Sequence, residues 1–69
     1  MRVIYDRETD TLSIVLGETP VAESDELREG LVVDYDSDGR IVSVEILDAS
    51  AHVAEPASMA FEFKETALP

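Results

Sequence analysis

The chain has 69 residues, of which sixteen are acidic and five basic, giving a formal net charge of −11 and a pI near 4.1. A surface of that charge repels the phosphates of nucleic acids and of anionic lipids, so neither partner is expected. Because cysteine is absent, disulfides and thiolate metal sites are excluded. A single histidine cannot build a zinc site without carboxylate help.

One small domain over residues 1–69 is expected. A chain of this length buries too little apolar surface to be very stable alone, so we expect a homodimer. Charge begins at the second residue, which does not fit a signal peptide, and no apolar run approaches a membrane span. A cytoplasmic location is expected.

Residues 1–16 have the pattern of a β-hairpin. Two runs that alternate apolar and polar residues are separated by a polar connection. The apolar positions fit a four-residue loop. The expected cross-strand pairs are Tyr5 with Leu12 and Val3 with Ile14.

Residues 21–28 are polar and acidic, with Val21 and Leu27 as the large apolar side chains. Both an irregular loop and a short edge strand fit this composition, and the sequence does not decide between them. In an edge strand, the charges would discourage pairing with other sheets.

Residues 31–47 give the strongest hairpin pattern. Two β-branched runs flank a turn of Asp, Ser, Asp and Gly. A four-residue loop over residues 37–40 keeps the apolar side chains on one face, whereas a loop one residue shorter would bring polar residues among them. The expected pairs are Asp36 with Ile41, Tyr35 with Val42, Val33 with Val44 and Leu31 with Ile46.

The same segment also fits the spacing of a calcium-binding loop, D-x-D-x-D-G-x5-E. The matching positions are Asp34, Asp36, Asp38, Gly39 and Glu45. A loop of this type lies between two helices, but here β-branched residues with period-two alternation flank it. The hairpin is therefore the favoured interpretation, with weak cation binding by a carboxylate-rich turn as an alternative.

The two hairpins resemble each other at an offset of thirty residues. Tyr5 matches Tyr35, for example, and Ile14 matches Val44. Duplication and chance likeness between two amphipathic hairpins both explain this match. Two equivalent hairpins could form one sheet or face each other across a core.

A helix signal follows Leu47. Asp48 is a good N-cap for a short helix near residues 48–55, and Pro56 stops it. His52 on this helix could serve as a catalytic base, but no neighbour in sequence orients it. A partly exposed helix histidine is the favoured interpretation.

Alternation returns near the C-terminus and predicts a strand over residues 59–64. Met59, Phe61 and Phe63 would share one face, packed on the chain's own sheet or added to another subunit. Residues 65–69 are expected to form a frayed end.

Two motifs carry a resemblance to a known family. They are Tyr5-Asp6-x3-Asp10-x-Leu12-x-Ile14 and Asp36-x-Asp38-Gly39-x-Ile41-Val42-x-Val44-Glu45-Ile46-Leu47-Asp48-Ala49-Ser50. Over roughly residues 1–52 the chain resembles domain of unknown function family 2283, small bacterial proteins whose pattern often has Gly where Ser43 stands. The resemblance implies a compact β-rich domain with a short helix and no assigned activity, so no catalytic residue carries over.

The sequence thus predicts an α+β fold, mostly β, with hairpins at residues 1–16 and 31–47. It contains no phosphate-binding loop, no nucleophile–base motif and no metal-spaced histidines, so no catalytic residue and no cofactor are expected. Asp side chains in turns have a structural explanation, since they hydrogen-bond the turn backbone.

We expect a non-catalytic, self-associating interaction module that binds a basic protein, an antitoxin-like neutraliser being one form of it. The alternatives are a small enzyme using a carboxylate pair and a weak divalent-cation binder at the turn between Asp34 and Glu45.

Overall fold

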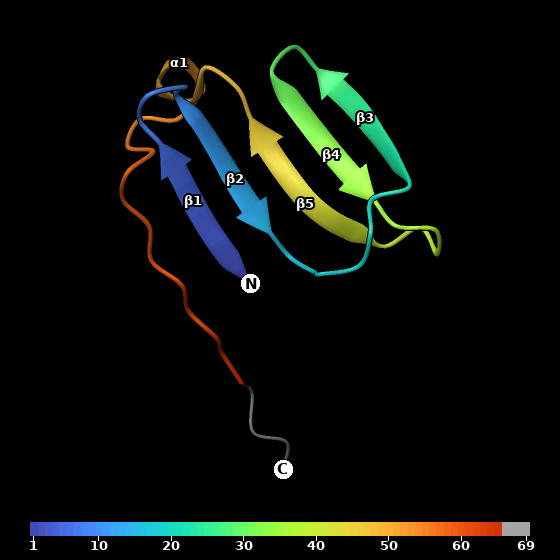
Figure 1. Cartoon of the computed structure of the whole chain (residues 1–69). Coiled ribbons are helices and arrows are strands. Elements are labelled where there is room, and N and C mark those ends of the chain that lie inside the picture. The colour runs from blue at the N-terminus through green and yellow to red at the C-terminus, as the bar shows by residue number, and fades with distance from the viewer. Residues whose placement is uncertain (66–69) are drawn as a thin grey trace.

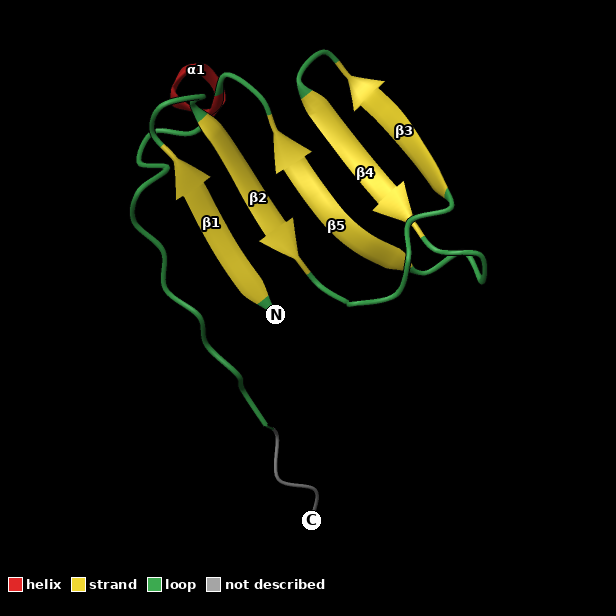
Figure 2. Ribbon diagram, in the orientation of Figure 1, coloured by secondary structure: helices red, strands yellow, loops and turns green. Residues whose placement is uncertain are grey.

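The computed structural model describes residues 1–65 and contains a five-stranded antiparallel sheet with one short helix (Figures 1 and 2). The elements are β1 (Arg2–Asp6), β2 (Thr11–Val15), β3 (Glu23–Arg28), β4 (Leu31–Tyr35), β5 (Ile41–Ile46) and α1 (Ala49–His52). The predicted mostly β class and both hairpins are confirmed. Most of the expected frayed end, residues 66–69, lies outside the described residues. Within the part described, no helix is long and apolar enough to cross a membrane.

The two hairpins lie in one sheet and do not face each other across a core. The strand order is β1-β2-β5-β4-β3, so β2 and β5 join the hairpins at the centre. Ile14 lies opposite Val44 in this central pair, and these are the residues that match in the internal repeat. A local twofold axis therefore passes between Ile14 and Val44 and relates one hairpin to the other.

The first hairpin has the predicted register. Tyr5 pairs with Leu12 and Val3 with Ile14, across a four-residue loop that ends at Asp10. Asp10 has a φ of 54°, in the left-handed region that closes such turns. Local alternation and turn chemistry were sufficient to fix this element.

The predicted register of the second hairpin is confirmed along most of the two strands but is wrong next to the turn. Leu31 pairs with Ile46 and Val33 with Val44, as expected, but Tyr35 lies opposite Ile41 because the register shifts by one residue. The cause is Asp36, whose N–H donates to the Arg40 carbonyl and whose carboxylate accepts backbone N–H groups within the loop. The loop therefore spans residues 36–40, and a β-bulge absorbs the extra residue.

Residues 21–28 contribute an edge strand. β3 pairs with β4 on one side, with a bulge between Glu26 and Arg28, and all six of its residues are exposed. The connection from β2 reaches β3 along the end of the sheet (Figure 1), held by an N–H of Ala22 donating to the Tyr35 carbonyl.

The helix begins where predicted but is shorter, ending at His52 four residues before Pro56. Asp48 occupies the N-cap position in a left-handed conformation, and its side chain makes no capping bond. The capping role belongs to Asp10 instead: its carbonyl accepts the N–H of Ala49, and its carboxylate accepts the N–H of Ser50. The prediction that the Asp48 side chain caps the helix was wrong, because Asp10 in the β1–β2 turn supplies the acceptors.

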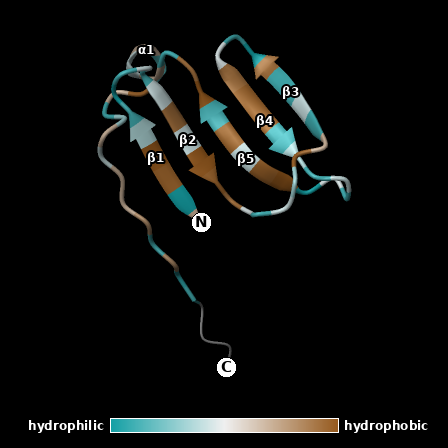
Figure 3. Cartoon of the chain, in the orientation of Figure 1, coloured by the Kyte–Doolittle hydropathy of each residue, from teal (hydrophilic) through white to brown (hydrophobic). Residues whose placement is uncertain are grey.

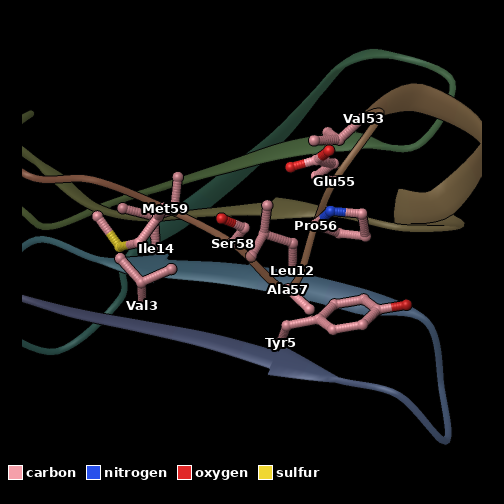
Figure 4. Close-up of a pocket in the computed structure, with 10 residues that line it drawn as sticks. All are labelled: Val3, Tyr5, Leu12, Ile14, Val53, Glu55, Pro56, Ala57, Ser58 and Met59. Carbon is pink, nitrogen blue, oxygen red and sulfur yellow. The ribbon is translucent and has the colours of Figure 1, made fainter.

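The predicted strand over residues 59–64 is wrong. Its backbone joins no ladder. Met59 lies beside Val3 and Ile14 (Figure 4), and the chain after it leads away from the sheet (Figure 1). Phe61 is 69% exposed and Phe63 is 80% exposed. The alternation of apolar residues is therefore real, but its apolar side has no complete cover within residues 1–65.

Gly30→Ala should destabilise the sheet more than Gly39→Ala. Both glycines have positive φ, 83° and 81°, where an L side chain costs about 1–2 kcal/mol. A Cβ at Gly30 would also lie 3.2 Å from the Leu47 carbonyl oxygen and 3.3 Å from His52 Nε2, whereas one at Gly39 meets nothing within 4 Å. Urea unfolding of both variants measures the difference, and equal losses would show that the contact at Gly30 relaxes freely.

Candidate interaction surface

One face of the sheet is apolar across four strands. Residues directly opposite each other in antiparallel strands share a face, so the register assigns the side chains. We define the apolar face by the two rows Val3–Ile14–Val44–Val33 and Tyr5–Leu12–Ile46–Leu31. Figure 3 shows hydrophobic segments along β1, β2, β5 and β4.

The chain after α1 covers one part of the apolar face. It passes over β1 and β2 and encloses a shallow hollow of about 230 Å³ (Figure 4). Met59 lies beside Val3 and Ile14, and Pro56 and Ala57 lie nearer Tyr5. This cover consists of one extended segment without secondary structure, so it leaves part of the apolar face uncovered.

The core is correspondingly thin. The buried apolar residues are Leu12, Val33, Val42 and Ala49, and within residues 1–65 no large side chain is completely buried. The chain exposes 5652 Å², whereas a compact monomer of its mass exposes roughly 4,300 Å². The extended chain after α1 contributes to this difference, since residues 57–65 are exposed.

Carboxylates border the apolar face along the β3 edge. Asp25 lies opposite Val33, so the first apolar row ends in an acidic residue. Glu23 lies opposite Tyr35, two pairs further along the same edge. The apolar face therefore runs into an acidic strand on one side and into the open edge of β1 on the other.

The opposite face of the sheet carries Asp34 in a polar row. Asp34 is 9% exposed and accepts hydrogen bonds from the hydroxyls of Ser24 and Ser43, each at 2.5 Å. These two bonds hold the pKa of Asp34 below its ordinary value of 3.8, and the bond from Ser24 has the larger effect. The carboxylate thus ties β3, β4 and β5 together.

Asp36 organises the central turn. One carboxylate oxygen accepts the N–H groups of Asp38 and Arg40, both at 2.9 Å, and the other accepts the Thr19 hydroxyl at 2.9 Å. The bond from the Arg40 N–H is the main reason that the pKa of Asp36 is lowered. Asp36 therefore also joins the β2–β3 connection to the turn.

The structure does not bring the four calcium candidates together. Strands β4 and β5, and not helices, flank the turn, and Glu45 lies on β5 opposite Ser13 and Val32. Asp34 and Asp36 already accept hydrogen bonds from the chain. Among residues 1–65 no three acidic or histidine side chains are grouped to hold a metal ion.

We therefore expect calcium affinity no better than millimolar, the weak end of protein calcium sites. An ion at the turn would have to displace the bonds that Asp34 and Asp36 make to serine hydroxyls and backbone N–H groups. Isothermal titration calorimetry checks this. Micromolar binding that is lost on Glu45→Gln would contradict the prediction.

Asp6 and Asp10 belong to the first turn. Asp6 accepts the N–H of Glu8 at 2.9 Å, as Asp36 does for the residue two positions later in the second turn. Asp10 accepts the Tyr5 hydroxyl at 2.6 Å and the Ser50 hydroxyl at 2.6 Å. The predicted bonding to the turn backbone is confirmed for Asp6, whereas the Asp10 carboxylate binds Tyr5 and Ser50 instead.

These contacts shift two pKa values in opposite directions. The Ser50 hydroxyl, followed by the Tyr5 hydroxyl, holds the pKa of Asp10 below 3.8. The pKa of Tyr5 is raised above 10.0, chiefly because its hydroxyl donates to Asp10. His52 is exposed at the end of α1, and in the described residues no hydrogen bond orients its side chain.

Residues 2–50 match the family model described as Protein of unknown function (DUF2283). The chain belongs to this family. The matched region contains the whole sheet and the start of α1, so it includes Asp10 and its partner Ser50. The segment from Val53 to Phe63 lies outside it. No curated protein and no solved structure matches the chain.

The hydrogen bonds of this DUF2283 chain give roles to several motif residues that sequence reasoning singled out. The turn aspartates bind backbone, and Asp10 holds α1. Sequence reasoning missed their hydroxyl partners Thr19, Ser24, Ser43 and Ser50. No local signal marks these partners, since a serine opposite an aspartate is visible only once strand pairing is known.

The stability of this DUF2283 chain should fall at both pH extremes. Asp10, Asp34 and Asp36 have lower pKa values folded than unfolded, so their stabilisation is complete above about pH 4 and is lost as the pH falls through the folded values. Tyr5 has a raised pKa, so its stabilisation is present below pH 10 and is lost above it.

Melting temperatures from pH 2 to pH 11 at constant ionic strength measure the loss of stability at acid pH and at alkaline pH. We expect a plateau from about pH 5 to pH 9. Tyr5→Phe should flatten the alkaline loss and reduce the acid loss only in part, because Asp10 keeps its bond from Ser50, the larger cause of its lowered pKa, and Asp34 and Asp36 are unchanged. A melting temperature that does not fall between pH 5 and pH 2 would contradict the assignment of the carboxylates.

Proposed function

We propose that the chain is a non-catalytic interaction module that self-associates and binds a basic protein. The observation that carries this proposal is the apolar face of the sheet, which ends at the acidic strand β3. Residues 53–59 cover part of this face over β1 and β2, and the end of α1 borders it at Leu31 and Ile46. Apolar surface with a polar border is typical of protein-interaction sites.

The open area supports self-association. The exposed apolar side chains next to the apolar face include Val3, Met59 and Phe61, so a second copy has apolar surface to cover there. Phe61 and Phe63, which are 69% and 80% exposed, add to this surface. Covering these groups supplies the burial that a 69-residue sheet lacks alone.

The charge supports a basic partner. β3 has the sequence Glu-Ser-Asp-Glu-Leu-Arg, all of it exposed, on a chain of net charge −11. Such a strip attracts a cationic surface at long range and raises the association rate. An antitoxin-like neutraliser of a basic protein is one form of this function.

A small enzyme with a carboxylate pair is the second candidate. Its support is a hollow between the β3–β4 turn and α1, with Asp10 of the β1–β2 turn at its side, lined in part by Asp10, Glu29, Ser50 and His52. Against it, the Asp10 carboxylate is already bonded to Ser50 and Tyr5, a structural use. An interaction role requires no such free group.

The proposal is tested by affinity capture from the native host with the tagged full chain, followed by identification of the bound protein. A basic partner whose affinity falls steeply with salt is the expected result. The variant Glu23→Gln/Asp25→Asn/Glu26→Gln should lose it. A matched control, Glu8→Gln/Glu18→Gln/Glu55→Gln, removes the same number of exposed charges elsewhere and should keep it.

Two results would overturn the binding proposal. One is equal partner loss in both charge variants, which would mean that the acidic strand has no special role. The other is the absence of a basic partner together with turnover of a substrate that depends on Asp10, which would favour the enzyme.

A further inference from the structure

The two edges of the sheet differ in a way that bears on self-association. β3 forms one edge and carries acidic residues at three of six positions. β1, at the other edge, pairs only with β2 among the described residues and has the sequence Arg-Val-Ile-Tyr-Asp. Its Val3 and Ile4 are 36% and 41% exposed. An open strand edge of this composition is a template for another strand.

The β1 sequence is complementary to itself in the antiparallel direction. When a second copy is placed about a twofold axis at Ile4, Arg2 lies opposite Asp6 of the second copy, and Val3 lies opposite its Tyr5. Ile4 then lies opposite itself. Each strand pair therefore contains two opposite-charge pairs and two aromatic–β-branched pairs, the combinations that stabilise antiparallel strands.

The faces of the sheet select this register. Val3 and Tyr5 lie on the apolar face, whereas Arg2, Ile4 and Asp6 lie on the other. A shift of one residue would place apolar side chains opposite charged ones and turn the second apolar face to the wrong side. Only the register centred on Ile4 uses all five residues and continues the apolar face without interruption.

The opposite edge excludes the alternative pairing. Two β3 strands side by side would bring Glu23, Asp25 and Glu26 of one copy against the same carboxylates of another, and like charges across strands are destabilising. The bulge between Glu26 and Arg28 further disturbs that edge.

We propose that two copies of the chain pair antiparallel through their β1 edges, about a twofold axis at Ile4, to form one continuous sheet. The inference rests on the self-association in the proposed function and names its surface. Met59 and Phe61, which lie beside Val3 and Met1 in each copy, border the seam on the apolar face. Both acidic β3 strands remain at the outer edges, free for the basic partner.

Cross-linking of the full chain tests the register directly, because the natural sequence contains no cysteine. Ile4→Cys places two thiols opposite each other at the axis, with Cβ atoms about 4.5–5.5 Å apart. Oxidation with diamide should convert this variant to a disulfide-linked dimer, read by intact mass. Glu26→Cys is the matched control, since the pairing pattern puts Glu26 on the same face as Ile4 but at the opposite edge.

A charge variant tests the pairing without a covalent bond. Arg2→Glu replaces both Arg2–Asp6 pairs at the seam by like-charge pairs and should raise the dimer dissociation constant about tenfold. Arg40→Glu makes the same charge change in the distant central turn and should leave that constant within about twofold. Sedimentation velocity gives the constants, and circular dichroism verifies that each variant is folded.

The outcomes separate the two proposals. A natural chain that sediments as a monomer at all concentrations would overturn self-association and this pairing together. A dimer in which Glu26→Cys cross-links as fast as Ile4→Cys, or in which Arg2→Glu and Arg40→Glu behave alike, would overturn the β1 pairing alone. Selective cross-linking of Ile4→Cys with selective weakening by Arg2→Glu supports it.

Discussion

Asp34→Ala should lower the free energy of unfolding by about 2–4 kcal/mol, from the loss of two hydrogen bonds to a charged acceptor. The carboxylate accepts the hydroxyls of Ser24 and Ser43, and with it absent both hydroxyls lose their acceptor. Because Asp34 is 9% exposed, water compensates poorly. Urea denaturation measures the loss.

Asp34→Asn provides the control with the same shape. It keeps one carbonyl acceptor but places an NH₂ donor where a second acceptor is needed, so its loss should be intermediate. The triple variant Ser24→Ala/Ser43→Ala/Asp34→Ala should be no worse than Asp34→Ala, since the unpaired hydroxyls are gone. If Asp34→Ala alone lowers the free energy of unfolding by less than about 0.5 kcal/mol, the bonds of Asp34 to Ser24 and Ser43 do not stabilise the fold.

Asp10→Ala should loosen α1 on the sheet, although the backbone bond from the Ala49 N–H to the carbonyl of residue 10 is kept. Asp10 accepts the N–H and hydroxyl of Ser50 through its carboxylate, and Asp10 and Ser50 are 40 residues apart. A helix of four residues has almost no stability of its own, so its position depends on such anchors. We expect the amide of Val53 to exchange with deuterium at least about tenfold faster, because the last helical hydrogen bond opens.

Tyr5→Phe is the matched control for this variant. It removes the other donor to Asp10 but leaves the carboxylate bonded to Ser50. Exchange at Val53 should therefore change less than in Asp10→Ala, while amides in β4 and β5 should change in neither. Equal exchange in the natural chain and in Asp10→Ala would show that packing over the sheet holds α1 without the Asp10 contact.

Together these variants separate structural carboxylates from free ones. Asp10, Asp34 and Asp36 each accept several hydrogen bonds from the chain itself, and their lowered pKa values follow from those bonds. The acidic residues of β3 make no such contacts and are exposed. A search for function in this DUF2283 chain is therefore best directed to its open surfaces.

Local sequence was sufficient for the first hairpin and for the second hairpin away from its turn. In the first, period-two alternation set the faces, and the polar connection set a four-residue loop, so the pairing of Tyr5 with Leu12 followed without tertiary information. Hairpin partners are close along the chain, so alternation and turn chemistry determine them together. The bonding of Asp6 and Asp36 to their turn backbones was likewise predictable from residue type and position.

The tertiary structure decided what depends on contacts distant in sequence. The joining of β2 to β5, the capping of α1 by Asp10 and the serine partners of Asp34 all require strands or turns that local periodicity does not relate. Tyr35 lies opposite Ile41 and not opposite Val42 as predicted, because the Asp36 side chain binds backbone N–H groups of the loop and lengthens it by one residue. The predicted strand at residues 59–64 failed because alternation shows which side chains seek cover, whereas a strand also needs a backbone partner within reach.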